Sequence, residues 1–257
     1  MMTARMMRNS LVLICAMTWS GAALAYRPFD GTDAAVAEFE KVEIELQPAG
    51  LQTQGSQKSL IGPAAVFNYG FAEDWEAVVQ GNAEVPLSPS GPVGLQGTGA
   101  FLKHVLREGS LQGKDGVSVA TEFGVLLPEI PGESRIGASL AGIVSQHWDW
   151  GTVHLNLAAS LTREQNGDGF VGVIVEGPSE WTVRPVAEIY YEKEVGRTDT
   201  VSGLVGLIWR VNDGLDVDLA VRHALTNGQP VDEIRAGLTI GFSASAAAMG
   251  LTGSVKR

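Results

Sequence analysis

Residues 201–222 read VSGLVGLIWRVNDGLDVDLAVR, and the pattern of this stretch is the starting point for predicting the fold. In its first half, apolar residues or glycine occupy every second position from Val201 to Trp209, and apolar residues do the same from Leu215 to Val221. The Asn-Asp-Gly sequence at 212–214 between the two halves is typical of a tight hairpin turn. Because a period of two places alternate side chains on opposite faces of a strand, the stretch predicts a β-hairpin with one apolar face.

The same alternation recurs along the rest of the chain. With the two strands of this hairpin, it predicts about twelve strands, an even number as single-chain bacterial barrels require. No helical layer is visible, so either a second sheet or lipid has to cover the apolar faces. The remaining alternating segments are 42–47, 65–69, 75–85, 101–108, 117–125, 136–148, 152–162, 171–175, 181–192 and 233–242.

The N-terminus predicts export. Arg5 and Arg8 precede an apolar run that begins at Leu11, and Ala23-Leu24-Ala25 forms a small-x-small cleavage site before Tyr26. This pattern is that of a secretory signal peptide over residues 1–25, because the apolar run is too short for a spanning helix. The single cysteine of the chain, Cys15, lies within it. The mature chain is therefore expected to have no disulfide and no thiol chemistry.

The net charge of the mature chain excludes some classes of function. The full chain has 18 basic and 29 acidic residues, so loss of Arg5 and Arg8 with the leader gives the mature chain a net charge of −13. Such a charge argues against nucleic-acid binding and against docking on an anionic membrane surface. No mature stretch approaches the ~18 apolar residues of a spanning helix. A mature chain that crosses a membrane therefore has to do so as a β-barrel.

The connections favour a barrel over a sandwich. Expected short connections alternate with longer ones, as in outer-membrane barrels with short periplasmic turns and longer outer loops. Residues 109–116 are an exception, because this connection should be short and is long. Pro185 is a second exception: it lies within a predicted strand but has no backbone N–H to donate to a neighbouring strand, and a closed barrel has no edge strand where that donor would not be needed. The short connections are 70–74, 148–151, 177–180 and 212–214, and the longer ones are 51–62, 86–99, 128–135, 163–167, 193–200 and 226–232.

Aromatic residues near strand ends predict interfacial girdles, because amphipathic rings prefer the level of the lipid headgroups. Core packing at the ends of a sheet is the alternative explanation. The residues concerned are Trp75, Trp148, Trp150, Trp181, Tyr191, Trp209 and Phe242.

A series of short motifs in a set order resembles the outer-membrane barrel family of the phenol meta-cleavage pathway. The resemblance spans residues 27–242, while the tail at 243–257 departs from the family. It implies an outer-membrane barrel that helps small hydrophobic compounds to enter, and it offers no catalytic residues to transfer. The motifs are Arg27-Pro28-Phe29 with Thr32-Asp33, the strand with Glu43 and Glu45, Asn68-Tyr69-Gly70-Phe71 with Glu76, Leu102-Lys103, the strand with Glu188, and residues 237–242 (GLTIGF).

The polar faces of the predicted strands supply candidate lumen-facing residues. A barrel of about twelve strands encloses water or a plug, so charges that face one another across it would narrow the pore and set its selectivity. The alternative is that these charges only satisfy each other and brace the wall. The candidates are Lys103, Glu122, His154, Arg184, Glu188, Arg210, Arg222, Glu233 and Arg235.

No enzyme, metal or cofactor is expected. His154 and Ser160 share a predicted face but lie roughly 20 Å apart along one strand, too far for a catalytic dyad. The histidines lack the spacing of metal ligands. Asn166-Gly167-Asp168-Gly169 is better explained as a hairpin turn than as a calcium loop.

The sequence thus predicts an all-β, antiparallel, up-and-down transmembrane barrel over residues 26–242. It would follow a signal peptide (1–25), precede a flexible tail (243–257), and reach the outer membrane of a Gram-negative bacterium by Sec-type export. Its expected partners are membrane lipid, a small solute and the outer-membrane assembly machinery. The leading hypothesis is a narrow channel for small, hydrophobic or aromatic solutes. The alternatives are a soluble periplasmic β-sandwich that binds a ligand, and a non-conducting structural barrel plugged by an inward loop such as residues 86–99.

Overall fold

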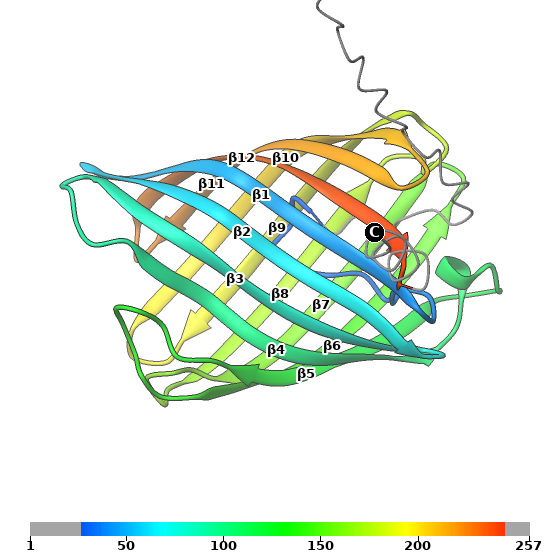
Figure 1. The fold of residues 1–257 in the computed structure, drawn as a ribbon, viewed down its shortest axis with the longest axis horizontal. Helices are drawn as coiled ribbons and strands as arrows, with labels where there is room; N and C mark the ends of the chain where they lie inside the picture. The colour runs from blue at the N-terminus through cyan, green and yellow to red at the C-terminus, as the bar shows by residue number, and fades with distance from the viewer. Residues whose placement is uncertain (1–26, 245–257) are drawn as a thin grey trace, which may run out of the picture.

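The structure, a computed structural model that describes residues 27–244, forms the predicted twelve antiparallel strands. Each strand pairs with the next along the chain, and β1 pairs with β12 to close the sheet into a barrel (Figure 1). The strands are β1 (Lys41–Gln54), β2 (Gln57–Ala72), β3 (Trp75–Ser88), β4 (Gly94–Arg107), β5 (Ser118–Leu126), β6 (Gly137–Trp148), β7 (Gly151–Leu161), β8 (Gly167–Glu176), β9 (Val183–Glu194), β10 (Thr198–Asn212), β11 (Leu215–Thr226) and β12 (Gln229–Ser243), with a 3₁₀ turn, η1 (Ser110–Gln112), between β4 and β5.

The two ends of the barrel are distinct. We call the end where β1 begins and β12 finishes the proximal end, and the other the distal end. The register of the closing pair runs from Lys41 opposite Ser243 at the proximal end to Gln54 opposite Val231 at the distal end. The even number of strands therefore returns the chain to the end at which the barrel began.

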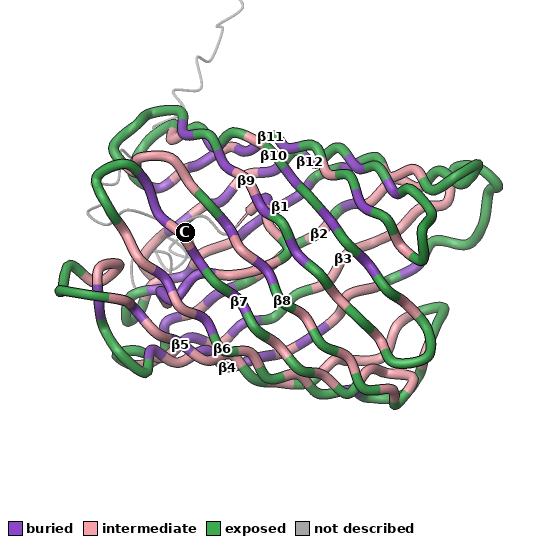
Figure 2. Tube along the Cα trace, turned by 180° about the vertical axis from the view of Figure 1, so that it is seen from behind, coloured by how far each residue is buried: buried purple, intermediate pink, exposed green. Residues whose placement is uncertain are grey.

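The outer face is apolar. Burial alternates residue by residue along β9, β10 and β11, and the outward set stays largely exposed although it is hydrophobic (Figure 2). Leu157, Ile189, Val205 and Leu219, for example, are 54%, 61%, 59% and 57% exposed. A closed sheet with such an exterior needs lipid to cover it, so the barrel spans an outer membrane and the soluble sandwich is wrong. Within residues 27–244, no helix is long and apolar enough to cross a membrane.

Tryptophan gathers at the proximal end. Trp148, Trp150, Trp181 and Trp209 are about half exposed, and the rings of Trp148 and Trp150 stack with centroids 5.3 Å apart. Trp75, at the start of β3, stacks on His104 with centroids 4.0 Å apart. An outward belt of indoles at one end of the strands fits an interfacial girdle better than a buried core.

The predicted alternation of short and long connections is confirmed only in part. The turns at 73–74, 149–150 and 213–214 are short and the link at 127–136 is long, as predicted, whereas the links at 195–197 and 227–228 are short. The predicted link at 51–62 is largely strand, because β1 continues to Gln54 and β2 begins at Gln57. The distal ends of β1 and β2 carry polar residues on both faces. They therefore lack the alternation of apolar and polar residues by which a strand is predicted from sequence. The expected exception at 109–116 is real: the chain makes η1 there before β5.

Pro185 fits the closed barrel because of its place in the register. The pairing of β8 with β9 ends at Glu176 opposite Val186, so the register of this pair stops next to Pro185. The position opposite Pro185 is therefore already past the end of β8, where no strand residue needs the N–H that proline lacks. The carbonyl of Pro185 accepts a hydrogen bond from Gly177 N at 2.8 Å. The predicted signal peptide, and the predicted tail apart from Ser243 and Ala244, lie outside the described residues.

Candidate functional site

The chain before β1 runs inside the barrel. We call residues 27–40 the inner segment; Figure 1 shows them in dark blue, enclosed by the strands. Ala34, Ala35 and Ala37 are at most 8% exposed. Gly70 on β2 lets the segment approach the wall, because a Cβ there would collide with the carbonyl oxygens of Ala37 and Glu38.

Wall side chains bond the backbone of the inner segment along its length. Asp30 N and Gly31 N donate to the two carboxylate oxygens of Glu188 at 2.8 and 2.7 Å. Thr32 N donates to Asn156 at 2.9 Å, and Ala37 N donates to Glu76 at 2.5 Å. The polar wall thus satisfies backbone donors that a segment without secondary structure would otherwise leave unpaired inside the barrel.

Arginines from the last strands anchor the start of the inner segment. Arg235 donates to Pro28 O at 2.8 Å and to the Asp30 carboxylate at 2.9 Å, and its guanidinium also lies 3.0 Å from Glu233. Arg222 lies 3.5 Å from the Asp30 carboxylate. Burial by itself would raise the pKa of Asp30, but the Arg235 and Arg222 guanidiniums outweigh it and hold that pKa below its ordinary value.

A second anchor holds the middle of the segment. Lys103 of β4 is 3% exposed, and its Nζ lies 3.2 Å from both the Asp33 carboxylate and the Thr32 hydroxyl. A lysine so deeply buried requires a compensating charge, and Asp33 provides one.

A chain of polar contacts lies beneath Ala34. Ser145 on β6 faces His154 on β7 directly in the register, with Oγ 2.8 Å from Nδ1, and His154 Nε2 lies 3.1 Å from Glu176. The Ser145 hydroxyl also accepts a hydrogen bond from Ala34 N at 2.9 Å. Although this order of groups is that of a serine triad, Ser145 is 0% exposed and does not line the cavity. In this structure the chain orients a hydroxyl that holds the inner segment.

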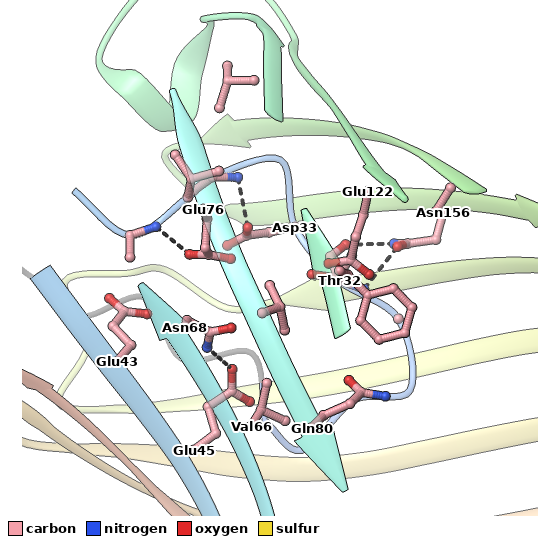
Figure 3. A pocket seen from close by; sticks show the side chains of 18 of the residues that line it. Thr32, Asp33, Glu43, Glu45, Val66, Asn68, Glu76, Gln80, Glu122 and Asn156 are labelled. Carbon is pink, nitrogen blue, oxygen red and sulfur yellow. Dashed lines mark hydrogen bonds between the residues drawn. The ribbon is translucent and has the colours of Figure 1, made fainter. Parts of the chain in front are cut away.

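A cavity of about 1060 Å³ lies beside the inner segment (Figure 3). Its lining reaches from Glu43 near the proximal end of β1 to Asp168 and Glu192 near the distal ends of β8 and β9. Residues of the inner segment from Phe29 to Phe39 form one side of it. Ion pairs therefore fill the interior of the barrel around the arginines of β9–β12. The interior is open beside the acidic side chains of β1, β3 and β5.

Of the nine predicted lumen-facing residues, only Glu122 lines the cavity. The other eight contact the inner segment or other side chains of the wall. Glu188, Arg222, Arg235 and Lys103 contact the inner segment. His154 holds Ser145, and Glu233 binds both Arg222 and Arg235. Arg184 lies 2.9 Å from Glu176 and 3.5 Å from Asp216, while the less buried Arg210 lies 3.9 Å from Asp216.

Sequence reasoning missed the cavity-lining carboxylates Glu43, Glu45 and Glu76, and the inner segment itself. The carboxylates do lie on polar faces of predicted strands, but nothing local separates a cavity-facing glutamate from a paired one. The inner segment has no periodicity. One signal was present: Asp30 and Asp33 stand among small residues between the predicted signal peptide and the first strand, where charges need partners from elsewhere.

Comparison with known proteins defines the class of fold. The structure superposes on an outer membrane channel from Pseudomonas putida F1 with a TM-score of 0.62 and 9% sequence identity, over 81% of this chain and 97% of that chain. The NanC porin gives 0.56 and 6%, over 77% and 98%, and the KdgM porin gives 0.53 and 13%, over 78% and 99%. No protein-family model matches the chain. No curated protein matches it in sequence.

At these identities the similarity establishes the fold alone. The chain has the fold of the outer-membrane porins and channels, a closed antiparallel barrel of twelve strands.

Proposed function

We propose that this protein is an outer-membrane channel that admits small solutes through the cavity beside the inner segment. The extent of that cavity carries the proposal, because its lining residues reach from the proximal part of β1 to the distal parts of β8 and β9. The anchored inner segment makes the passage narrow, which suits small solutes rather than polymers. The similarity in fold to porins is consistent with this function.

We further propose that the solutes include small aromatic compounds, as the resemblance to the meta-cleavage barrels implies. The rings of Phe29, Phe101 and Phe170 line the cavity and offer stacking surfaces along it. Sec-type export and insertion by the outer-membrane assembly machinery complete the proposal.

Single-channel recording of the purified protein in a planar bilayer tests it. Ala158 lines the cavity from β7, and the next residue, Ala159, is exposed on the outer face of the same strand. We expect Ala158→Trp to lower the conductance several-fold and Ala159→Trp to leave it unchanged, because only the first indole enters the passage. Absence of conductance in the wild-type protein, or equal conductance in the two variants, would contradict the proposal.

The inner segment also supports a second candidate, a structural barrel that does not conduct. The plug is not the predicted loop at 86–99 but residues 27–40, held by wall side chains along its length. The same recording separates the two candidates, since a non-conducting barrel gives no current with either tryptophan variant.

A further inference from the structure

The charge of the cavity lining is strongly one-sided. Among the described residues that form it, twelve carry a carboxylate and one, Lys41, carries an amine. Lys103 lies close by, but it is bonded to Asp33 and Thr32. The arginines of the interior do not line the cavity. They pair with Asp30, which is one of the twelve, and with Asp216, Asp218, Glu176 and Glu233, which are not part of the lining. A permeating ion in the cavity therefore meets many carboxyl groups and one described cationic side chain, Lys41.

Four of these carboxylates have at least one oxygen without a partner among the described residues. Within residues 27–244, Glu43 and Glu122 accept no hydrogen bond and form no ion pair. Glu45 and Glu76 are 6% and 5% exposed. Each uses one oxygen: Glu45 accepts from Asn68 Nδ2 at 2.9 Å, and Glu76 accepts from Ala37 N at 2.5 Å. Figure 3 shows these four side chains and Asp33 around the same space. Confined carboxylates with unused acceptor atoms favour a mobile cation beside them.

The arrangement does not fit a fixed metal ion. No group of three or more histidine, cysteine or acidic side chains converges closely enough to hold a metal among residues 27–244. Instead, the acidic positions are spread along the cavity and interleaved with the phenyl rings of Phe29, Phe101 and Phe170. Carboxylates attract a cation at a distance, and aromatic faces bind one that carries an apolar body. The volume of about 1060 Å³ accommodates a ring-sized solute.

We infer that the cavity selects small organic cations, amines with an aromatic or aliphatic body, over anions of the same size. The inference rests on the proposed channel function and names its substrate class. Glu43 and Glu122 accept no hydrogen bond and form no ion pair within residues 27–244, so their oxygens are available to a passing ammonium group, whose positive charge favours their ionised form. The phenyl rings contact the body of the solute.

The test uses one salt whose ions differ mainly in charge, benzyltrimethylammonium benzenesulfonate, across the full-length protein in a planar bilayer. Conductance is first established in potassium chloride. A gradient of the aromatic salt then gives the permeability ratio of cation to anion from the reversal potential. We expect a ratio of about ten or more, in the range that a cleft lined by one sign of charge produces. The double substitution Glu43→Gln and Glu122→Gln should bring it to within about twofold of unity, since glutamine keeps the shape and removes the charge.

The matched control removes two charges elsewhere. Glu133 and Glu180 lie in connections outside the cavity lining, so Glu133→Gln with Glu180→Gln should keep the wild-type ratio. Heat-modifiable migration on a gel establishes that each variant is folded. Conductance in potassium chloride with a ratio near or below one, or with no current from the aromatic salt, overturns the inference and leaves the channel standing. Absence of conductance in potassium chloride overturns the channel as well.

Discussion

The carboxylate of Asp30 lies 2.9 Å from the guanidinium of Arg235, although 205 residues separate them in the chain. The contact joins the inner segment to β12, the strand that closes the barrel against β1. Arg235 also donates to Pro28 O, so a single side chain holds both the backbone and the charge of the segment. The anchor is therefore complete only after the last strand has been added.

Removal of this arginine should free the inner segment. Arg235→Met leaves Asp30 and Glu233 without their main partner, and breaking a buried pair costs about 3–5 kcal/mol of stability. We expect a loss of that size in urea unfolding of the reconstituted protein, together with a higher single-channel conductance. The control is Arg197→Met, which removes the more exposed pair with Glu164 at 2.7 Å and should cost no more than about 1 kcal/mol. Equal losses would show that Asp30 and Arg235 are not an anchor.

The approach of the inner segment to β2 can be tested at a glycine. A Cβ at Gly70 would collide with backbone oxygens of Ala37 and Glu38, whereas a Cβ at Gly142 meets nothing within 4 Å. Since backbone atoms cannot move aside as a side chain can, we expect Gly70→Ala to cost about 1–3 kcal/mol. Gly142→Ala should be close to neutral. Thermal unfolding in detergent measures both, and a neutral Gly70→Ala would place the segment elsewhere.

The pH dependence of the anchor follows from the lowered pKa of Asp30. A carboxyl whose folded pKa lies below its ordinary value of 3.8 stabilises the fold fully above that value, and the contribution is lost as pH falls through the folded pKa. Arg235, Arg222 and Arg27 favour its ionised form, while the Glu188 carboxylate faces the backbone beside it.

In a Glu188→Gln background, which removes the carboxyl group that interacts most directly with Asp30, the stability difference between the protein with Asp30 and its Asp30→Asn variant should therefore stay constant from pH 8 to about pH 5 and shrink only at lower pH. Subtracting the variant removes the contributions of titrating groups that do not interact with Asp30. Urea unfolding at a series of pH values measures the difference, and Asp149→Asn in an exposed turn serves as the control. A difference that already fades between pH 7 and pH 5 would contradict the lowered pKa.

The sequence predicted the barrel well because alternation is a local signal. Residues 201–222 show two strands and their turn, and the structure pairs Val205 with Val221 as that hairpin requires. The same signal made Lys103 a lumen-facing candidate, and its side chain is 3% exposed in the structure. Lipid on one side and polar groups on the other impose this pattern on each strand.

The filling of the lumen could not be predicted in this way. Thr32 N bonds Asn156, 124 residues further along the chain, and nothing near Thr32 points to that partner. The inner segment takes its conformation from the wall, so it lacks a period of its own. For the same reason Glu122 and Glu188 look alike in sequence, although one lines the cavity and the other binds backbone donors. Which charges remain unpaired depends on the closed barrel as a whole.

The lipid-facing surface gives the last prediction. Leu157 lies midway along β7 with its side chain 54% exposed, and Leu161 lies at the distal end of the same strand with 44% exposed. Both face outward, so exposure to water would make Leu→Arg similarly harmless at either position. In a bilayer the cost depends on depth, about 2–4 kcal/mol for arginine at the midplane and about 0–1 kcal/mol near the interface.

We therefore expect Leu157→Arg to lower the free energy of unfolding in vesicles by roughly 2–4 kcal/mol and Leu161→Arg to lower it by at most about 1 kcal/mol. Urea titration of both variants in the same vesicles measures the difference. The comparison is internal to one strand and one face, so changes in strand propensity largely cancel. Equal costs at the two positions would mean that water rather than hydrocarbon surrounds the middle of β7, and the apolar outer face would then need a protein partner to cover it.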